Sequence, residues 1–168
     1  MSPVASASDL AQWQARMDRM DDERAIERLK QDYADCCDRG YDLDRMCTLF
    51  TPQARWSANG YGDFSGHAQI RTFFAAMASQ VLEAMHYITS PRIDIDPSGE
   101  RARAQFYLLC LCRSRHPKDP QRIDPVVIVG RYDDDLVKLD GRWFFERLHV
   151  EVRYTRRLSD GVARAASS

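Results

Sequence analysis

The chain has 168 residues, the usual length of a single domain that folds around its own core. A composition of 44% hydrophobic and 29% charged residues indicates a soluble globular protein. The 24 basic and 25 acidic residues give a net charge of −1, which excludes the strong field that would attract nucleic acid or an anionic membrane. We expect a cytoplasmic protein, because no apolar run is long enough for a membrane helix and the N-terminus lacks the pattern of a secretory signal.

The five cysteines favour small buried side chains over a disulfide framework or a zinc site. Cys36 and Cys37 are adjacent, Cys47 stands alone, and Cys110 and Cys112 alternate in an apolar segment. An odd number of cysteines without a C-x-x-C pair fits neither kind of site. We therefore expect no metal centre built on them.

Residues 1–20 are expected to form a polar N-terminal arm, and the first helix is predicted for residues 21–40. Apolar side chains recur there at helical spacing, namely Ile26, Leu29, Tyr33 and the Cys36–Cys37 pair. Gly40 suits the left-handed position that ends a helix. A short second helix is predicted over residues 43–50, and a third over residues 67–82.

The rest of the chain is predicted to be strands. Two brief strands flank the Asn59-Gly60 turn, and four longer strands cover residues 86–95, 101–115, 126–140 and 142–158. Residues 116–125 are predicted to be a proline-rich loop, and residues 159–168 a loose tail. The folded domain is therefore expected to span residues 21–158.

This order of elements predicts an α+β fold in which helices cover one face of a curved antiparallel sheet. A curved sheet of long strands leaves a hollow at its open end, and small-molecule sites occur in such hollows. The aromatic and polar residues expected to line it are Tyr33, Trp56, Phe73, His86, Phe106, Trp143 and Tyr154.

Three stretches carry a resemblance to a known family: AIERLKQDYADCCDRGYDLDRMCTLFTPQARW, MHYITSPRIDI and GRYDDDLVKLDGRWFFERLHVEVRYTRRL. In this order they resemble the SnoaL-like branch of the nuclear transport factor two-like superfamily, whose members are cone-shaped α+β barrels. The resemblance covers roughly residues 21–158. Within the superfamily the chain is similar to cofactor-free lyases of the bile acid dehydratase and hexachlorocyclohexane dehydrochlorinase type, and more distantly to scytalone dehydratase.

The resemblance implies a catalytic pair in which an aspartate at the end of the first helix works with a histidine at the start of the third strand. These roles fall on Asp38 and His86. Tyr33, about one helical turn before Asp38, matches a tyrosine of the bile acid dehydratases. The superfamily also contains cyclases, isomerases and proteins without catalysis, so the fold alone does not decide the function.

The chemistry of these three side chains suits an elimination. Histidine accepts a proton near neutral pH, and a carboxylate on one ring nitrogen fixes the tautomer and stabilises the imidazolium. Such a general base contributes on the order of 10²–10⁴ in rate. A tyrosine hydroxyl can bind a carbonyl or departing oxygen as charge develops on it. No metal or organic cofactor is required.

Each residue also has a structural alternative. His86 could be a packed pocket histidine, and Tyr33 a core tyrosine whose hydroxyl is satisfied. Helical periodicity puts Asp38 well off the apolar face, so only the resemblance places its carboxylate in the pocket. Asp35 is the competing acid and is equally far from that face.

Arg147 and His149 are kept as candidate substrate-binding residues, although strand alternation groups them with Glu151 on a charged face. The same alternation puts Phe144 on the face of Leu148. A bulge in the last strand would change this register.

The segment Phe106–Cys112 is apolar on both faces, which favours self-association through the sheet. By the resemblance, a homotrimer is favoured slightly over a dimer.

The sequence thus predicts a cofactor-independent lyase, most simply a dehydratase, that acts on a small, fairly apolar cyclic or aromatic substrate. In this hypothesis His86 removes the proton, Asp38 orients the ring, and Tyr33 binds the departing or carbonyl oxygen. The alternatives are an isomerase or polyketide-type cyclase that uses the same pocket, and a non-catalytic ligand-binding domain.

Overall fold

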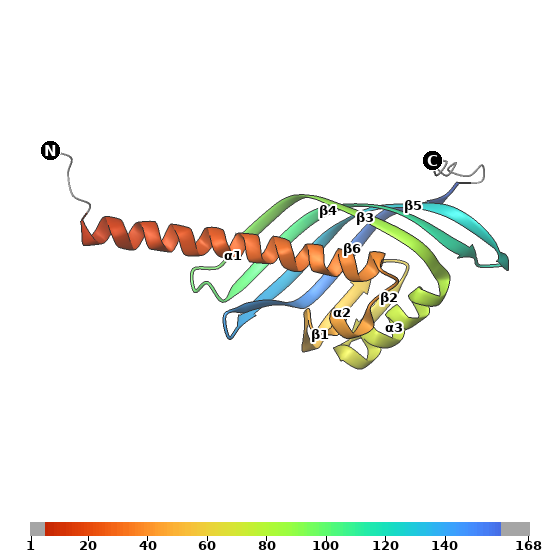
Figure 1. Cartoon of the computed structure of the whole chain (residues 1–168), viewed down its shortest axis with the longest axis horizontal. Helices are drawn as coiled ribbons and strands as arrows, with labels where there is room; N and C mark the ends of the chain where they lie inside the picture. Colours follow the sequence, from red (N-terminus) through yellow and green to blue (C-terminus); the bar gives the residue numbers. More distant parts are fainter. Residues whose placement is uncertain (1–5, 159–168) are drawn as a thin grey trace, which may run out of the picture.

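The long first helix, α1 (Ala7–Asp38), opens the described part of the chain, which is residues 6–158 of a computed structural model (Figure 1). A capping box fixes its N-terminus, because Ser6 and Asp9 each accept a hydrogen bond from the other's backbone N–H. The helix therefore starts at Ala7. The prediction that it starts near residue 21 is wrong. The expected tail at residues 159–168 lies outside the described residues.

Only the second half of α1 packs against the body, whereas its first half projects beyond the sheet (Figure 1). Its buried side chains are Ile26, Leu29, Lys30, Tyr33, Cys36 and Cys37. None of the helices within residues 6–158 combines the length and the apolar character that crossing a membrane demands.

Two short helices follow α1. Gly40 and Tyr41 adopt positive φ angles of 80° and 63°, which reverse the chain, and the Asp42 carboxylate then caps α2 (Leu43–Cys47). The third helix, α3 (Gly66–Gln80), buries Ile70 and Phe74 and packs mainly on the first strand.

Six strands form one curved sheet in the order β2-β1-β6-β5-β4-β3. Their bounds are β1 (Phe50–Ala58), β2 (Gly62–Ser65), β3 (Val81–Ile95), β4 (Arg101–His116), β5 (Asp119–Leu139) and β6 (Arg142–Arg157). The α+β fold with a curved sheet is confirmed. The sheet is mixed rather than antiparallel throughout, because α3 carries the chain to the far edge and the meander from β3 returns β6 parallel to β1.

The predicted proline-rich loop at residues 116–125 is mostly strand. Pairing between β4 and β5 continues to the hairpin tip, where His116 lies opposite Asp119. The register shifts between Arg115 and His116, and this irregularity accommodates Pro120, which has no N–H for the ladder.

A bulge also changes the faces of β6. Arg147 lies opposite Asp135 but Phe145 lies opposite Leu136, so one residue of β6 is extra. As a result Phe145 and Leu148 are both buried, and the prediction that Phe144 shares the face of Leu148 is wrong.

A buried ion pair joins α1 to β5. Lys30 Nζ donates to Asp134 Oδ2 at 2.8 Å, and both side chains are almost completely buried. Burial lowers the pKa of Lys30 to about 8 and raises the pKa of Asp134 to about 6, although the pair's mutual attraction opposes both shifts. Because the charged form of each group is disfavoured relative to the unfolded chain, ionisation of the pair costs stability near pH 7.

We expect Lys30→Met alone to lower the free energy of unfolding by about 3–5 kcal/mol, since it leaves the buried Asp134 carboxylate without its counter-charge. The double variant Lys30→Met/Asp134→Leu removes both charges and should be at least as stable as the wild type at pH 7. Urea denaturation measures both. A double variant as unstable as the single one would show that the pair is a net source of stability.

Candidate active site

His86 and Asp38 meet where the end of α1 reaches β3. Asp38 Oδ1 lies 2.5 Å from His86 Nδ1, and the same carboxylate accepts the backbone N–H of His86, with its two oxygens at 3.0 and 3.2 Å. The carboxylate holds the proton of the ring on Nδ1, so the lone pair stays on Nε2. Both side chains are only partly exposed, 12% for His86 and 27% for Asp38.

Asp38 reaches His86 although it lies off the buried face of α1, because it is the last residue of the helix and β3 crosses just there. The strand begins at Val81, five residues earlier than predicted, so His86 stands inside β3 and not at its head. Asp35, the competing acid, forms ion pairs with Arg39 and Arg45 and is half exposed. It does not contact His86.

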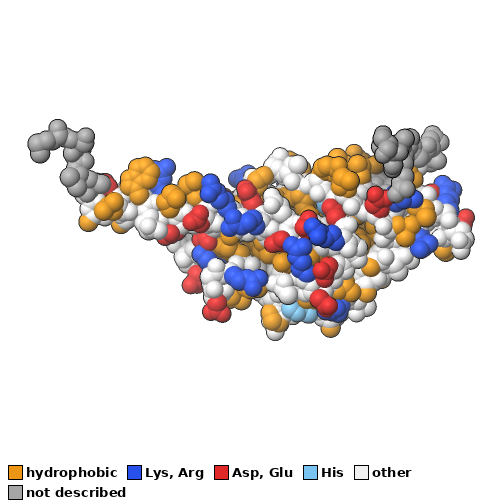
Figure 2. Space-filling model, in the orientation of Figure 1, with side chains coloured by type: hydrophobic (Ala, Val, Ile, Leu, Met, Phe, Trp, Pro, Cys, Tyr) orange, Lys and Arg blue, Asp and Glu red, His pale blue; other side chains and the backbone are white. Residues whose placement is uncertain are grey.

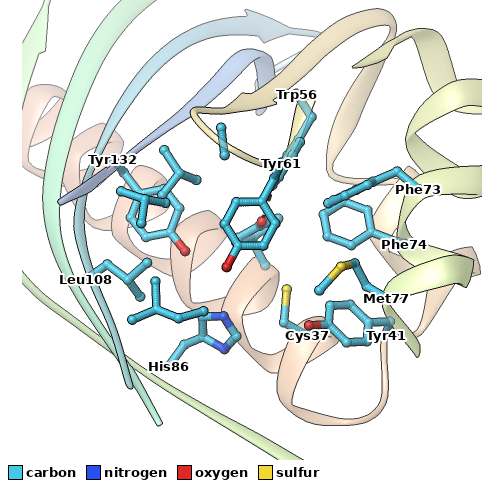
Figure 3. Close-up of a pocket in the computed structure, with 15 residues that line it drawn as sticks. Cys37, Tyr41, Trp56, Tyr61, Phe73, Phe74, Met77, His86, Leu108 and Tyr132 are labelled. Atoms are coloured by element: carbon cyan, nitrogen blue, oxygen red, sulfur yellow. Dashed lines mark hydrogen bonds between the residues drawn. The ribbon is translucent and has the colours of Figure 1, made fainter. Parts of the chain in front are cut away.

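A cavity of about 70 Å³ opens beside His86, between the sheet, α1 and α3 (Figure 3). Its wall is formed by Tyr33, Cys37, Tyr41, Trp56, Ala58, Tyr61, Phe73, Phe74, Met77, His86, Leu108, Ile128, Tyr132, Val150 and Val152. Apart from the histidine, this wall contains only apolar, aromatic and thiol side chains, with no carboxylate, ammonium or guanidinium group. The cavity therefore suits a small, uncharged molecule.

Tyr33 lies in this wall, as predicted. Its hydroxyl oxygen accepts a hydrogen bond from Trp56 Nε1 at 2.9 Å, so its own O–H remains a donor. Burial raises the pKa of Tyr33 well above its ordinary value, which keeps the phenol protonated. Trp56 and Phe73, both predicted to bind substrate, also line the cavity, with ring centroids 4.4 Å apart.

Sequence reasoning missed three further phenols of the cavity wall, Tyr41, Tyr61 and Tyr132. Figure 3 shows the hydroxyls of Tyr61 and Tyr132 directed into the space in front of His86. Burial raises the pKa of Tyr41 and of Tyr132, so both remain neutral donors. Alternation along β5 could have placed Tyr132 on the inner face with Leu136, whereas Tyr61 lies in a turn that has no periodicity.

Two predicted substrate-binding aromatics lie outside the cavity wall. Phe106 is buried deeper in the cone, where the Lys30 ammonium lies 5.4 Å from its ring centroid. Trp143 is buried against α1 and donates from Nε1 to Asp22 at 2.9 Å. Both side chains are core residues, and the cavity does not extend to them.

The other three predicted substrate-binding residues, Arg147, His149 and Tyr154, lie on the outer side of the sheet. Arg147 donates to Asp135 at 2.5 Å, and His149 Nδ1 lies 2.9 Å from the hydroxyl of Ser57. Tyr154 is 57% exposed near the end of β6. The alternation that groups Arg147 with His149 on a polar face is thus correct, and their assignment to the substrate pocket is not.

Within residues 6–158, no three His, Cys, Asp or Glu side chains converge on a point where a metal ion could bind. The chemistry available at this site is that of an imidazole, a carboxylate behind it, and several neutral phenols.

Comparison with known protein families identifies the fold. The model of the SnoaL-like domain family matches residues 18–149, which include Asp38, His86 and most of the cavity wall. The chain is a SnoaL-like protein. Its family belongs to the nuclear transport factor two-like superfamily. No curated protein matches the sequence.

Solved structures of other proteins superpose closely on this SnoaL-like chain. A hexachlorocyclohexane dehydrochlorinase, LinA type 2, is 22% identical with a TM-score of 0.78 over 90% of this chain and 97% of its own. A protein from Novosphingobium aromaticivorans, provisionally named a scytalone dehydratase, is 22% identical with a TM-score of 0.73 over 90% and 95%. Another from the same organism, provisionally named an aromatic ring hydroxylase, is 24% identical with a TM-score of 0.72 over 84% and 96%. At these identities the likeness establishes the fold alone.

The tautomer of His86 can be tested without a substrate. In the wild type, nitrogen-15 NMR should show a protonated Nδ1 and an unprotonated Nε2 on the neutral ring, because the Asp38 carboxylate binds the Nδ1 proton. Asp38→Ala should shift the proton towards Nε2. The matched change Asp35→Ala, on the exposed acid of the same helix, should leave the tautomer unaltered, and equal shifts in both variants would contradict the assignment.

Proposed function

We propose that this SnoaL-like protein is a cofactor-independent lyase that eliminates water or another small leaving group next to an acidic C–H bond. The observation that carries the proposal is the hydrogen bond between Asp38 and His86 at the wall of an apolar cavity. It combines a base, the group that orients the base, and a space where a substrate could lie against it.

In the proposed reaction His86 Nε2 takes the proton from carbon, and the electrons of the C–H bond form the new double bond. The leaving group departs with the electrons of its own bond, and a leaving hydroxyl takes a proton from Tyr33 or a neighbouring phenol to leave as water. Asp38 stabilises the imidazolium, and proton transfer back to the phenolate through the cavity resets the site. The balance requires no oxidant, reductant or metal.

The wall of the cavity supports a substrate that is small, uncharged and fairly apolar. Flat aromatic rings form one side, where Trp56 and Phe73 lie close together with their ring planes tilted by 32°, and this favours a cyclic or aromatic compound. The phenols Tyr33, Tyr61 and Tyr132 offer donors for one or two oxygens, such as a hydroxyl and a carbonyl. The names of two structural neighbours, a dehydrochlorinase and a dehydratase, agree with an elimination.

The same base also supports an isomerase or a cyclase, in which the proton removed by His86 returns to the product. Product analysis separates the reactions: an elimination releases water or an acid and lowers the mass of the organic product, whereas isomerisation leaves the mass unchanged. A protein that binds such compounds and converts none of them would be a ligand-binding domain.

We expect His86→Gln to lower the turnover of a hydroxy-ketone or aromatic alcohol that the protein dehydrates by about 10²–10⁴-fold, because glutamine cannot act as a base at neutral pH. The melting temperature should change little, since the ring makes its hydrogen bond at the cavity wall and not in the core. Steady-state kinetics and thermal melting measure the two effects.

His149→Gln is the matched control, because this histidine lies on the outer face of the sheet beside Ser57. It should retain wild-type turnover. Full activity of His86→Gln, or an equal loss in both variants, would refute the role of His86 as the base.

A further inference from the structure

The projecting half of α1 carries an apolar stripe without a partner in the described chain. Leu10, Trp13, Met17 and Met20 recur in steps of three, four and three residues, and they are 45–61% exposed. Figure 2 shows hydrophobic side chains gathered along this part of the helix, away from the body of the molecule. Four large apolar side chains on one exposed helix face are unusual for a surface that meets only water.

The stripe faces away from the protein's own core. At about 100° per residue it lies roughly 180° around the helix from the buried side chains Ile26, Leu29 and Tyr33. Further along the same face the residues are polar, with Arg24 and Gln31 in the positions that would continue the stripe. The apolar surface is therefore confined to the part of α1 that projects, on the side of the helix opposite the protein's own core.

The three-four spacing is that of a coiled-coil seam, in which two helices pair along their apolar positions. Leu10 and Met17 take the a positions, and Trp13 and Met20 take the d positions. A helix with this seam opposite its own body can pair with an identical helix while the two bodies lie on the outer sides.

The charges that flank the seam select the direction of pairing. In a parallel pair, Arg16 of one copy faces Asp21 of the other, so this contact joins opposite charges. In an antiparallel pair with the stripes in line, Arg16 would face Arg16, and Asp9 would face Glu23. The flanks therefore favour the parallel arrangement.

We propose that residues 7–23 of α1 form a parallel coiled coil with the same segment of a second copy of this chain. The proposal does not depend on catalysis. The SnoaL-like match begins at residue 18, so Leu10, Trp13 and Met17 lie outside the matched region. The capping box at Ser6 and Asp9 stabilises the helix end that the pairing requires, because this end lacks the tertiary packing that gives most helices in proteins their stability.

Cysteine cross-linking in the full chain tests the contact directly. Trp13→Cys places a thiol at a d position, where two parallel copies bring the same residue together, so mild oxidation should link two copies rapidly. Ala15→Cys is the matched control on the opposite face of the helix and should link at least tenfold more slowly. Both are made with Cys47→Ser, which removes the one native thiol that is not buried.

Equal cross-linking rates for Trp13→Cys and Ala15→Cys would overturn the proposal, whatever else holds the copies together. A mixed disulfide between Trp13→Cys and Met17→Cys that forms faster than either symmetric one would overturn the parallel direction. These readouts do not depend on whether the apolar sheet face also associates.

Charge reversal gives a second test. Arg16→Glu should raise the dissociation constant of the dimer, measured by sedimentation, by about threefold or more, because it opposes Asp21 of the other copy. The double variant Arg16→Glu/Asp21→Arg should restore the wild-type value at low salt. A double variant no tighter than the single one would show that these two residues do not face each other.

Discussion

The carboxylate of Asp38 ties the end of α1 to β3 through two donors of a single residue, the backbone N–H and the ring nitrogen of His86. One contact fixes the position of the strand relative to the helix, and the other fixes the orientation of the ring. Since Tyr33 and Cys37 precede Asp38 on the same helix, fixing its end also places these two side chains in the cavity wall. The proposed chemistry depends on this joint more than on any other contact.

Charge is distributed so that the cavity itself stays neutral. The fully buried ion pair of Lys30 and Asp134 lies deeper in the cone, behind Tyr132, whose ring centroid is 3.2 Å from the ammonium nitrogen. Burial raises the pKa of Tyr33 and of Tyr132, so these two phenols stay protonated and can donate hydrogen bonds to an oxygen that gains charge. An apolar wall with neutral donors discriminates against charged compounds, because no Asp, Glu, Lys or Arg side chain lines it to compensate for the loss of their hydration.

Periodicity predicted most of the elements. Of the seven residues expected to line the hollow, His86, Tyr33, Trp56 and Phe73 lie in the cavity wall, and the other three do not. Periodicity failed where a single residue interrupts a pattern. The bulge in β6 adds one residue, so the face predicted for Phe144 is the wrong one. Periodicity also missed the exposed start of α1, because that segment has a cap and local side-chain pairs but no buried stripe. Asp38 could not be placed from periodicity, because a helix end is positioned by the turn that follows it.

The central claim is that the imidazole of His86 is the base. The most direct test is the pH dependence of kcat/KM for a substrate that undergoes the elimination. An imidazole that has already bound a proton cannot accept another, so kcat/KM should fall tenfold per pH unit on the acid side. The midpoint should coincide with the titration of His86 followed by NMR in the free protein. A rate that stays constant through that titration would contradict the account.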